Sequence, residues 1–169
     1  MYDMTFVDPA MTSWSLLRQT WIVTNKVAEA RLSRMGLTPE KAAVLWACRD
    51  YPGVLTPAEV SRLVFREAQS VAGLLNRMEK EGLVKRIPKR KGRPFTEIKA
   101  TPKGEELCDP AVAILKDVIQ GLTSDLAPEE RDHFHNTLQK LRDKMFDQLH
   151  MELGHPPAFR TEDTIPLNW

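Results

Sequence analysis

Residues 55–104 decide the fold of this 169-residue chain, and they read LTPAEVSRLVFREAQSVAGLLNRMEKEGLVKRIPKRKGRPFTEIKATPKG. Thr56, Pro57 and Glu59 form a helix start, because threonine caps the first turn, proline fits the first helical position and glutamate can bond back to the cap. A tight turn follows this short helix. A second helix then carries one apolar stripe, made by Val71, Leu74, Leu75 and Met78. The two helices are expected to pack as a helix-turn-helix.

A basic hairpin is predicted directly after the second helix. Gly82 ends that helix, as a cap residue with left-handed backbone does. Residues 83–88 and 95–100 are two short runs with alternating apolar residues, and the tip between them is KRKGRP. Helix, turn, helix and hairpin in this order predict a winged helix-turn-helix.

The charge distribution favours a polyanionic partner for this module. Residues 56–104 hold 12 basic and 5 acidic residues, a net charge of +7, whereas the rest of the chain carries −6. Residues 83–93 contain six basic residues in eleven and no acid. A basic patch of this kind is the electrostatic footprint of phosphate binding. A solvated surface hairpin is the alternative, but the position after a helix-turn-helix favours DNA binding.

The second helix supplies the predicted base-reading residues. Its face opposite the buried stripe carries Gln69, Ser70, Ala72, Gly73, Asn76 and Arg77. Glutamine and asparagine can pair with adenine and arginine with guanine, while small residues allow close approach. An ordinary solvated helix face is the alternative interpretation.

Further cations and one cap residue complete the predicted DNA-binding set. Arg90, Lys91 and Arg93 at the wing tip are expected to reach a minor groove or its flanking phosphates. Thr56 and Arg66 are the remaining members. Lys85 and Arg86 are expected to contact phosphate or to flank the hairpin sheet.

The stretch resembles the multiple-antibiotic-resistance regulator (MarR) family of bacterial transcription factors. The matching residues are Thr56 with the helix after it, 70–79, 82–86 and 101–104, and a weaker likeness covers about residues 12–150. Two departures stand out. Lys91 occupies a place, two residues before Arg93, where the family often has aspartate. The turn between the two helices is also one residue longer, which puts the start of the second helix near residues 66–68.

The resemblance implies an assembly and a mode of control. It implies that the first helix and the last two helices form a dimer interface. It also implies that a small ligand, bound between the dimerisation and DNA-binding lobes, weakens DNA binding. Trp14, Trp21 and Trp46 are candidates to line a pocket for such an aromatic or amphipathic effector, and each has a core role as its alternative.

The helices outside the basic module show patterns of helix pairing. The predicted helix 12–35 is apolar on two sides, as a helix packed between partners is. Another helix is predicted from Thr101 to about Leu126, interrupted at Pro110. The last one has a spacing close to a coiled-coil seam, and its predicted dimer-interface residues are Phe134, Leu138, Leu141, Met145 and Leu149.

The predicted organisation is mostly α. An N-terminal arm (1–11) precedes a MarR-like domain (12–150), in which a winged helix-turn-helix (about 38–104) lies between dimerisation helices 12–35 and 101–150. The Pro-rich tail (151–169) is expected to pack on the dimerisation helices.

Composition narrows the class of protein. Apolar content of 42% and charged content of 28% are typical of a soluble globular chain. The longest apolar run, residues 42–48, is too short to cross a membrane, and no signal-peptide pattern begins the chain. Two cysteines make no disulfide framework, so a cytoplasmic location is expected. Catalytic motifs and metal-ligand spacings are absent from the sequence, so we expect no enzyme activity, cofactor or metal.

These observations predict a homodimeric regulator that binds an inverted repeat in double-stranded DNA and represses transcription until a small effector releases it. A winged-helix adaptor for protein partners is one alternative. A redox-responsive regulator that uses Cys48 or Cys108 is another.

Overall fold

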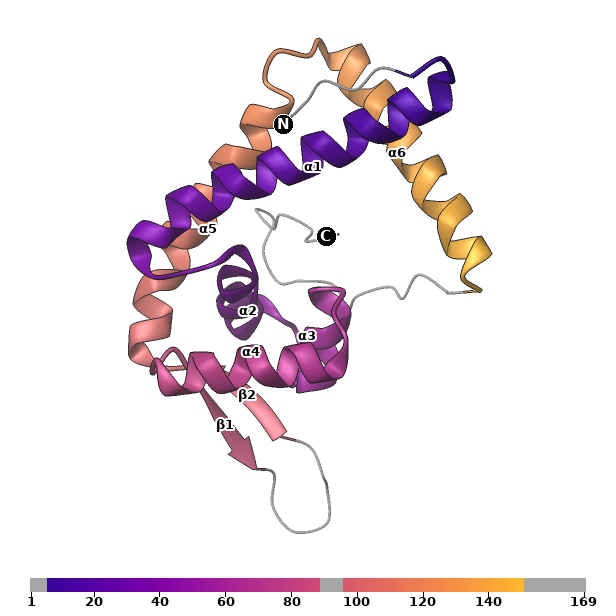
Figure 1. The fold of residues 1–169 in the computed structure, drawn as a ribbon. Helices are drawn as coiled ribbons and strands as arrows, with labels where there is room; N and C mark the ends of the chain where they lie inside the picture. The colour runs from indigo at the N-terminus through magenta and orange to yellow at the C-terminus, as the bar shows by residue number, and fades with distance from the viewer. Residues whose placement is uncertain (1–5, 89–95, 151–169) are drawn as a thin grey trace.

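The computed structural model describes residues 6–88 and 96–150. In these residues the chain forms helices α1 to α6, the short 3-10 helix η1, and strands β1 and β2 (Figure 1). The prediction of a mostly α winged helix-turn-helix with a two-stranded hairpin is confirmed.

The winged-helix lobe contains α2 (Pro39–Asp50), α3 (Pro57–Leu63), α4 (Ala68–Lys80), β1 (Val84–Pro88) and β2 (Thr96–Ala100). Each of Thr38, Thr56 and Thr101 caps the helix that follows it, because its side-chain oxygen accepts a backbone N–H of the first turn. In all three cases a proline takes the first helical position. The same short sequence signal therefore fixes three of the helix starts.

The hairpin is antiparallel and is joined to the helices by backbone bonds. Its register runs from Val84 opposite Ala100 to Pro88 opposite Thr96. The Ile98 amide donates to the Leu55 carbonyl at 2.8 Å, so the segment before α3 extends the edge of the sheet. Figure 1 shows both strands projecting away from the helices at the lower end of the lobe.

The other helices are α1 (Pro9–Leu32), α5 (Pro102–Leu122) and α6 (Pro128–Gln148). In Figure 1, α1 and α6 form the upper part of the molecule, and α5 runs from beside the lobe up to them. The helix η1 (Ser33–Met35) and Gly36, at a φ of +69°, end the first helical segment. An ion pair between Arg31 and Asp117 links α1 to α5. Helix α5 thus leads from the lobe to α6, with α1 attached along it.

Two predicted boundaries of these helices were wrong. The first helix begins at Pro9 rather than Thr12, because the Asp8 carboxylate accepts the Ala10 amide at 2.8 Å and caps the chain earlier. The predicted arm 1–11 therefore loses residues 9–11 to α1. The helix after the hairpin ends at Leu122 rather than Leu126.

Pro110 does not interrupt α5 as predicted. The helix is continuous from Pro102 to Leu122 with Pro110 inside it and exposed. Proline removes one backbone hydrogen bond. The bonds of the turns on either side are enough to continue the helix.

The core lies in the winged-helix lobe and extends into the lower part of α5 and the end of α1. Its largest fully buried side chains are those of Leu32, Leu45, Leu75, Met78, Ile98, Val44, Val60, Val71 and Val84. Helix α6 contributes no buried residue in this single chain. Among the described residues, no helix has both the length and the apolar character that crossing a bilayer requires.

Candidate nucleic-acid interface

Helix α4 has the two faces that the sequence predicted. The apolar stripe, Val71, Leu74, Leu75 and Met78, is buried against the lobe. On the other face Gln69, Ser70, Asn76 and Arg77 are exposed, and Gly73 is half-buried. Four of these predicted base-reading residues are therefore presented to solvent on one rigid helix.

The turn before α4 is tight and has an unusual backbone conformation. Phe65 has a φ of +46°, in the left-handed region that residues with a Cβ rarely adopt. The Ser61 hydroxyl donates to the Arg66 carbonyl and closes the turn. Helix α4 then starts at Ala68, within the predicted range.

Thr56 and Arg66 of the predicted set have contacts within the lobe. Thr56 caps α3, its hydroxyl oxygen accepting the Glu59 amide at 3.2 Å. The Arg66 guanidinium pairs with Glu40 of α2 at 3.1 Å. Thr56 thus has a structural role, and the charge of Arg66 is partly compensated before any ligand binds.

An ion pair between the buried Lys41 and the exposed Glu81 links α2 to the end of α4. The Nζ of Lys41, at the start of α2, donates to both carboxylate oxygens of Glu81 at 2.8 and 2.7 Å. Gly82 follows with a φ of +71°, which confirms its predicted role as the helix cap. Because Lys41 is buried, removing Glu81 would leave its charge uncompensated.

Arg86 of β1 forms a contact with α4 that the sequence did not predict. Its Nη2 donates to Asn76 Oδ1, and its backbone amide donates to Glu79 Oε1 at 3.1 Å. The hairpin and the outer face of α4 are therefore joined directly. The sequence does contain a signal for a shared partner, because the three-residue spacing of Asn76 and Glu79 places both on one side of a helix.

The predicted wing-tip cations Arg90, Lys91 and Arg93 lie outside the described residues. Of the cations on the described strands, Lys85 is exposed, whereas Lys99 pairs with Glu97 at 3.3 Å.

The structure gives the three candidate effector-site tryptophans different environments. Trp46 is buried in the core of the lobe. The side chains of Trp14 and Trp21 on α1 are exposed by 60% and 57%. Trp46 is therefore a core residue, whereas Trp14 and Trp21 are available on this chain to contact another molecule.

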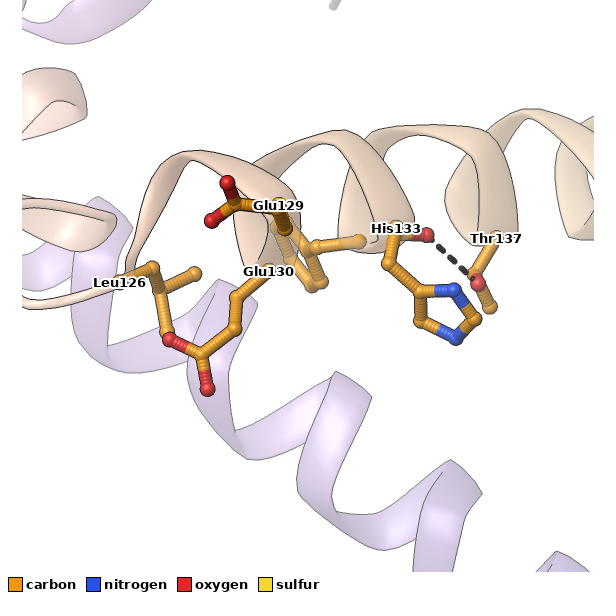
Figure 2. A pocket seen from close by; sticks show the side chains of 6 residues that line it. Leu126, Glu129, Glu130, His133 and Thr137 are labelled. Carbon is orange, nitrogen blue, oxygen red and sulfur yellow. Dashed lines mark hydrogen bonds between the residues drawn. The ribbon is translucent and has the colours of Figure 1, made fainter.

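A shallow pocket lies elsewhere, at the start of α6 (Figure 2). Its volume is about 540 Å³, and it is lined by Leu126, Glu129, Glu130, His133, Phe134 and Thr137. The Thr137 hydroxyl donates to the His133 carbonyl at 2.8 Å, a bond within the helix. The candidate tryptophans are not part of this lining.

The cysteines are poorly suited to rapid oxidation. Burial raises the pKa of the Cys48 thiol to about 12, with a further contribution from Cys108. Burial also raises the pKa of Cys108 to about 11, although Arg49 acts in the opposite direction. Since the thiolate is the reactive form, both side chains are expected to react slowly. In residues 6–88 and 96–150, groups of metal-ligating side chains large enough to hold an ion are also absent.

Apolar side chains are exposed along α1 and α6. On α6 these are Phe134, Leu141 and Met145, followed by Leu149 at its end, whereas Leu138 is half-buried. On α1 they include Trp14, Leu16, Leu17, Trp21, Val23 and Val27. Two helices with this much exposed apolar surface are unusual for a monomeric soluble protein.

The two helices α3 and α4, the adjacent hairpin and the long flanking helices together define a winged helix-turn-helix protein. Residues 35–93 match the model of the MarR family. This match overlaps the residues that carry the resemblance to that family in the sequence. No curated protein matches the chain in a sequence search.

Solved structures share the fold across almost their whole length. S. aureus MepR in complex with DNA has 22% identity and a TM-score of 0.72, and the match covers 78% of this chain and 96% of that chain. A cysteine-to-serine mutant of E. coli MarR, complexed with operator DNA, has 20% identity, coverage of 82% and 99%, and a TM-score of 0.70. The organohalide-sensing regulator RdhR, in its 2,4-dichlorophenol-bound form, has 22% identity, coverage of 95% and 99%, and a TM-score of 0.75.

Proposed function

We propose that the protein is a transcriptional regulator that binds double-stranded DNA in a sequence-specific manner. The observation that carries this proposal is helix α4, which buries one apolar stripe and exposes Gln69, Ser70, Asn76 and Arg77 beside the hairpin. Planar amide and guanidinium groups on an exposed helix can pair with base edges in the major groove. The basic segment 83–93 adds contacts to phosphate.

The regulator acts as a homodimer on an inverted repeat. The exposed apolar residues of α1 and α6 need a partner, and a second copy supplies the same surfaces in a two-fold arrangement. A dimer also doubles the contacts of so small a reading module, with each copy on one half-site. The organisation predicted from the sequence fits this assembly. The predicted packing of the tail 151–169 on the dimerisation helices lies outside the described residues and stays a prediction.

A small aromatic or amphipathic effector is proposed to release the protein from DNA, which makes it a repressor. The support is similarity to a regulator solved with 2,4-dichlorophenol, together with the exposed Trp14 and Trp21. Such a ligand must bind the DNA-free arrangement more tightly than the DNA-bound one, because it shifts the equilibrium only by its difference in affinity.

A cytoplasmic location follows from this function, since the DNA is there. MarR-family proteins are transcription regulators rather than enzymes, and we propose no catalytic activity, cofactor or metal for this chain. The adaptor and redox alternatives gain no support from the described residues.

The test is selection of bound duplexes from a random pool by the purified protein. We expect an enriched inverted repeat whose half-sites lie about one helical turn apart. Recovery of unenriched sequences, with binding that depends on salt alone, would refute sequence-specific recognition.

A further inference from the structure

Arg86 holds the side chain of Asn76 from the neighbouring strand. Asn76 lies on the exposed face of α4, and Arg86 reaches it from β1. The bond runs from Arg86 Nη2 to Asn76 Oδ1. Asn76 therefore has a fixed partner on the face proposed to read DNA.

The chemistry of the pair determines which end of the amide remains for a ligand. A guanidinium carries only donors, so only the oxygen of the Asn76 amide can face Arg86. The Nδ2 group, with its two N–H donors, is then the end of the amide turned away from Arg86. Bidentate pairing with adenine requires the amide oxygen as well, because it must accept the N6 amino proton while Nδ2 donates to N7.

Glu79 keeps Arg86 in this position. Its Oε1 accepts the Arg86 backbone amide at 3.1 Å, and its Oε2 lies 3.6 Å from Arg86 Nε. The Arg86 side chain is only 30% exposed, and its buried Nε makes no hydrogen bond. Arg86 is thus more than half-covered and is balanced by a carboxylate, unlike a cation that extends freely toward phosphate.

We propose that Arg86 is a positioning residue that determines the base preference of Asn76. By holding Oδ1 toward β1, it turns the two Nδ2–H donors of Asn76 toward DNA. Asn76 then favours the paired acceptors N7 and O6 of guanine, or the O4 of thymine, over adenine and cytosine, whose amino groups oppose these donors. This inference rests on the proposed DNA-binding function and adds a specific base-reading role to it.

The test compares base preferences at one position of the selected operator. Asn76→Ala first identifies the base pair whose identity no longer affects affinity. Affinities for the four bases at that pair are then measured for wild type, Arg86→Met and Arg86→Lys. Methionine removes every donor, whereas lysine keeps a cation that can still donate to Oδ1.

We expect wild type and Arg86→Lys to prefer guanine or thymine at that pair. In Arg86→Met the freed amide can rotate, and the preference should shift toward adenine by about tenfold, the effect of one good bidentate contact. Preferences at the other base pairs should not change. Where circular dichroism shows Arg86→Met to be unfolded, Arg86→Gln provides the comparison. A glutamine amide both donates and accepts, so it can pair with either end of the Asn76 amide and does not require Oδ1 to face it.

A different pattern would overturn the proposal. If Arg86 simply binds phosphate, its replacement lowers affinity for all four bases alike, reduces the salt slope by about one unit and leaves the preference unchanged. Failure of the proposed function is distinguishable, because wild type would then show no sequence preference at any position.

Discussion

Replacing Gly104 by alanine should destabilise the protein, because Gly104 is where α5 meets the base of the wing. The residue is buried in the first turn of α5. A Cβ added there would lie 2.1 Å from the Leu83 carbonyl oxygen and 3.0 Å from Leu45 Cδ2. Leu45 can adjust its side chain, but the Leu83 carbonyl is backbone and accepts the Thr101 amide at 3.0 Å. Relief therefore requires α5 to move away from the hairpin.

The expected loss of unfolding free energy is about 2 kcal/mol. Overpacking in a closed site costs roughly 1–3 kcal/mol, and the close backbone contact favours the upper end of that range. Alanine has the higher helix propensity, and this offsets up to about 1 kcal/mol of that loss relative to glycine. For a chain of this size, such a change lowers the melting temperature by about 4–8 °C.

Gly121→Ala is the matched control in the same helix. Gly121 is exposed, and nothing lies within 4 Å of its added Cβ. This variant should be as stable as wild type or slightly more stable, by up to about 1 kcal/mol. Thermal denaturation followed by circular dichroism, at one fixed protein concentration, compares the three proteins. Equal melting temperatures for Gly104→Ala and Gly121→Ala would refute the packing argument.

Further outcomes concern the dimer, the thiols and the tail. Leu141→Glu should shift sedimentation toward the monomer. Asn136→Asp, the same charge change on the opposite side of α6, should not. If both variants sediment as dimers, the proposed interface is contradicted. Alkylation of Cys48 and Cys108 by iodoacetamide at about pH 8 should be slow in the native protein and fast in denaturant, since their pKa values of about 12 and about 11 leave little thiolate. Equal rates in both states would show that burial does not protect the thiols. Deleting residues 156–169 should lower the melting temperature, and an unchanged value would argue against a packed tail.

Local signals in the sequence were sufficient to predict most of the winged-helix lobe. The threonine-proline starts, the stripe from Val71 to Met78 and the cap at Gly82 each act within one or two turns of chain. Asp8 is an equally local cap, but it lies outside the apolar pattern that marked the first helix at Thr12. Pro110 is a local signal for an interruption, but it removes only one backbone hydrogen bond, and α5 continues through it.

The contacts that organise the candidate site are not local, and the sequence did not predict them. Lys41 meets Glu81 across 40 residues, and Arg86 meets Asn76 between a strand and a helix. Periodicity shows which face a residue occupies but does not identify its partner on another element. For the same reason, periodicity does not show that Trp46 is buried in the core while Trp14 and Trp21 are exposed.

The central claim, sequence-specific DNA reading by α4, is tested most directly by fluorescence anisotropy on the selected duplex and a scrambled one at several salt concentrations. Wild type should bind the selected duplex at least about a thousandfold more tightly. Asn76→Ala should lose about tenfold in affinity on the selected duplex and almost nothing on the scrambled one. Lys91→Ala should weaken binding to both alike and reduce the salt slope by about one unit. Equal affinities of wild type for the two duplexes, or equal losses from Asn76→Ala on both, would contradict the account.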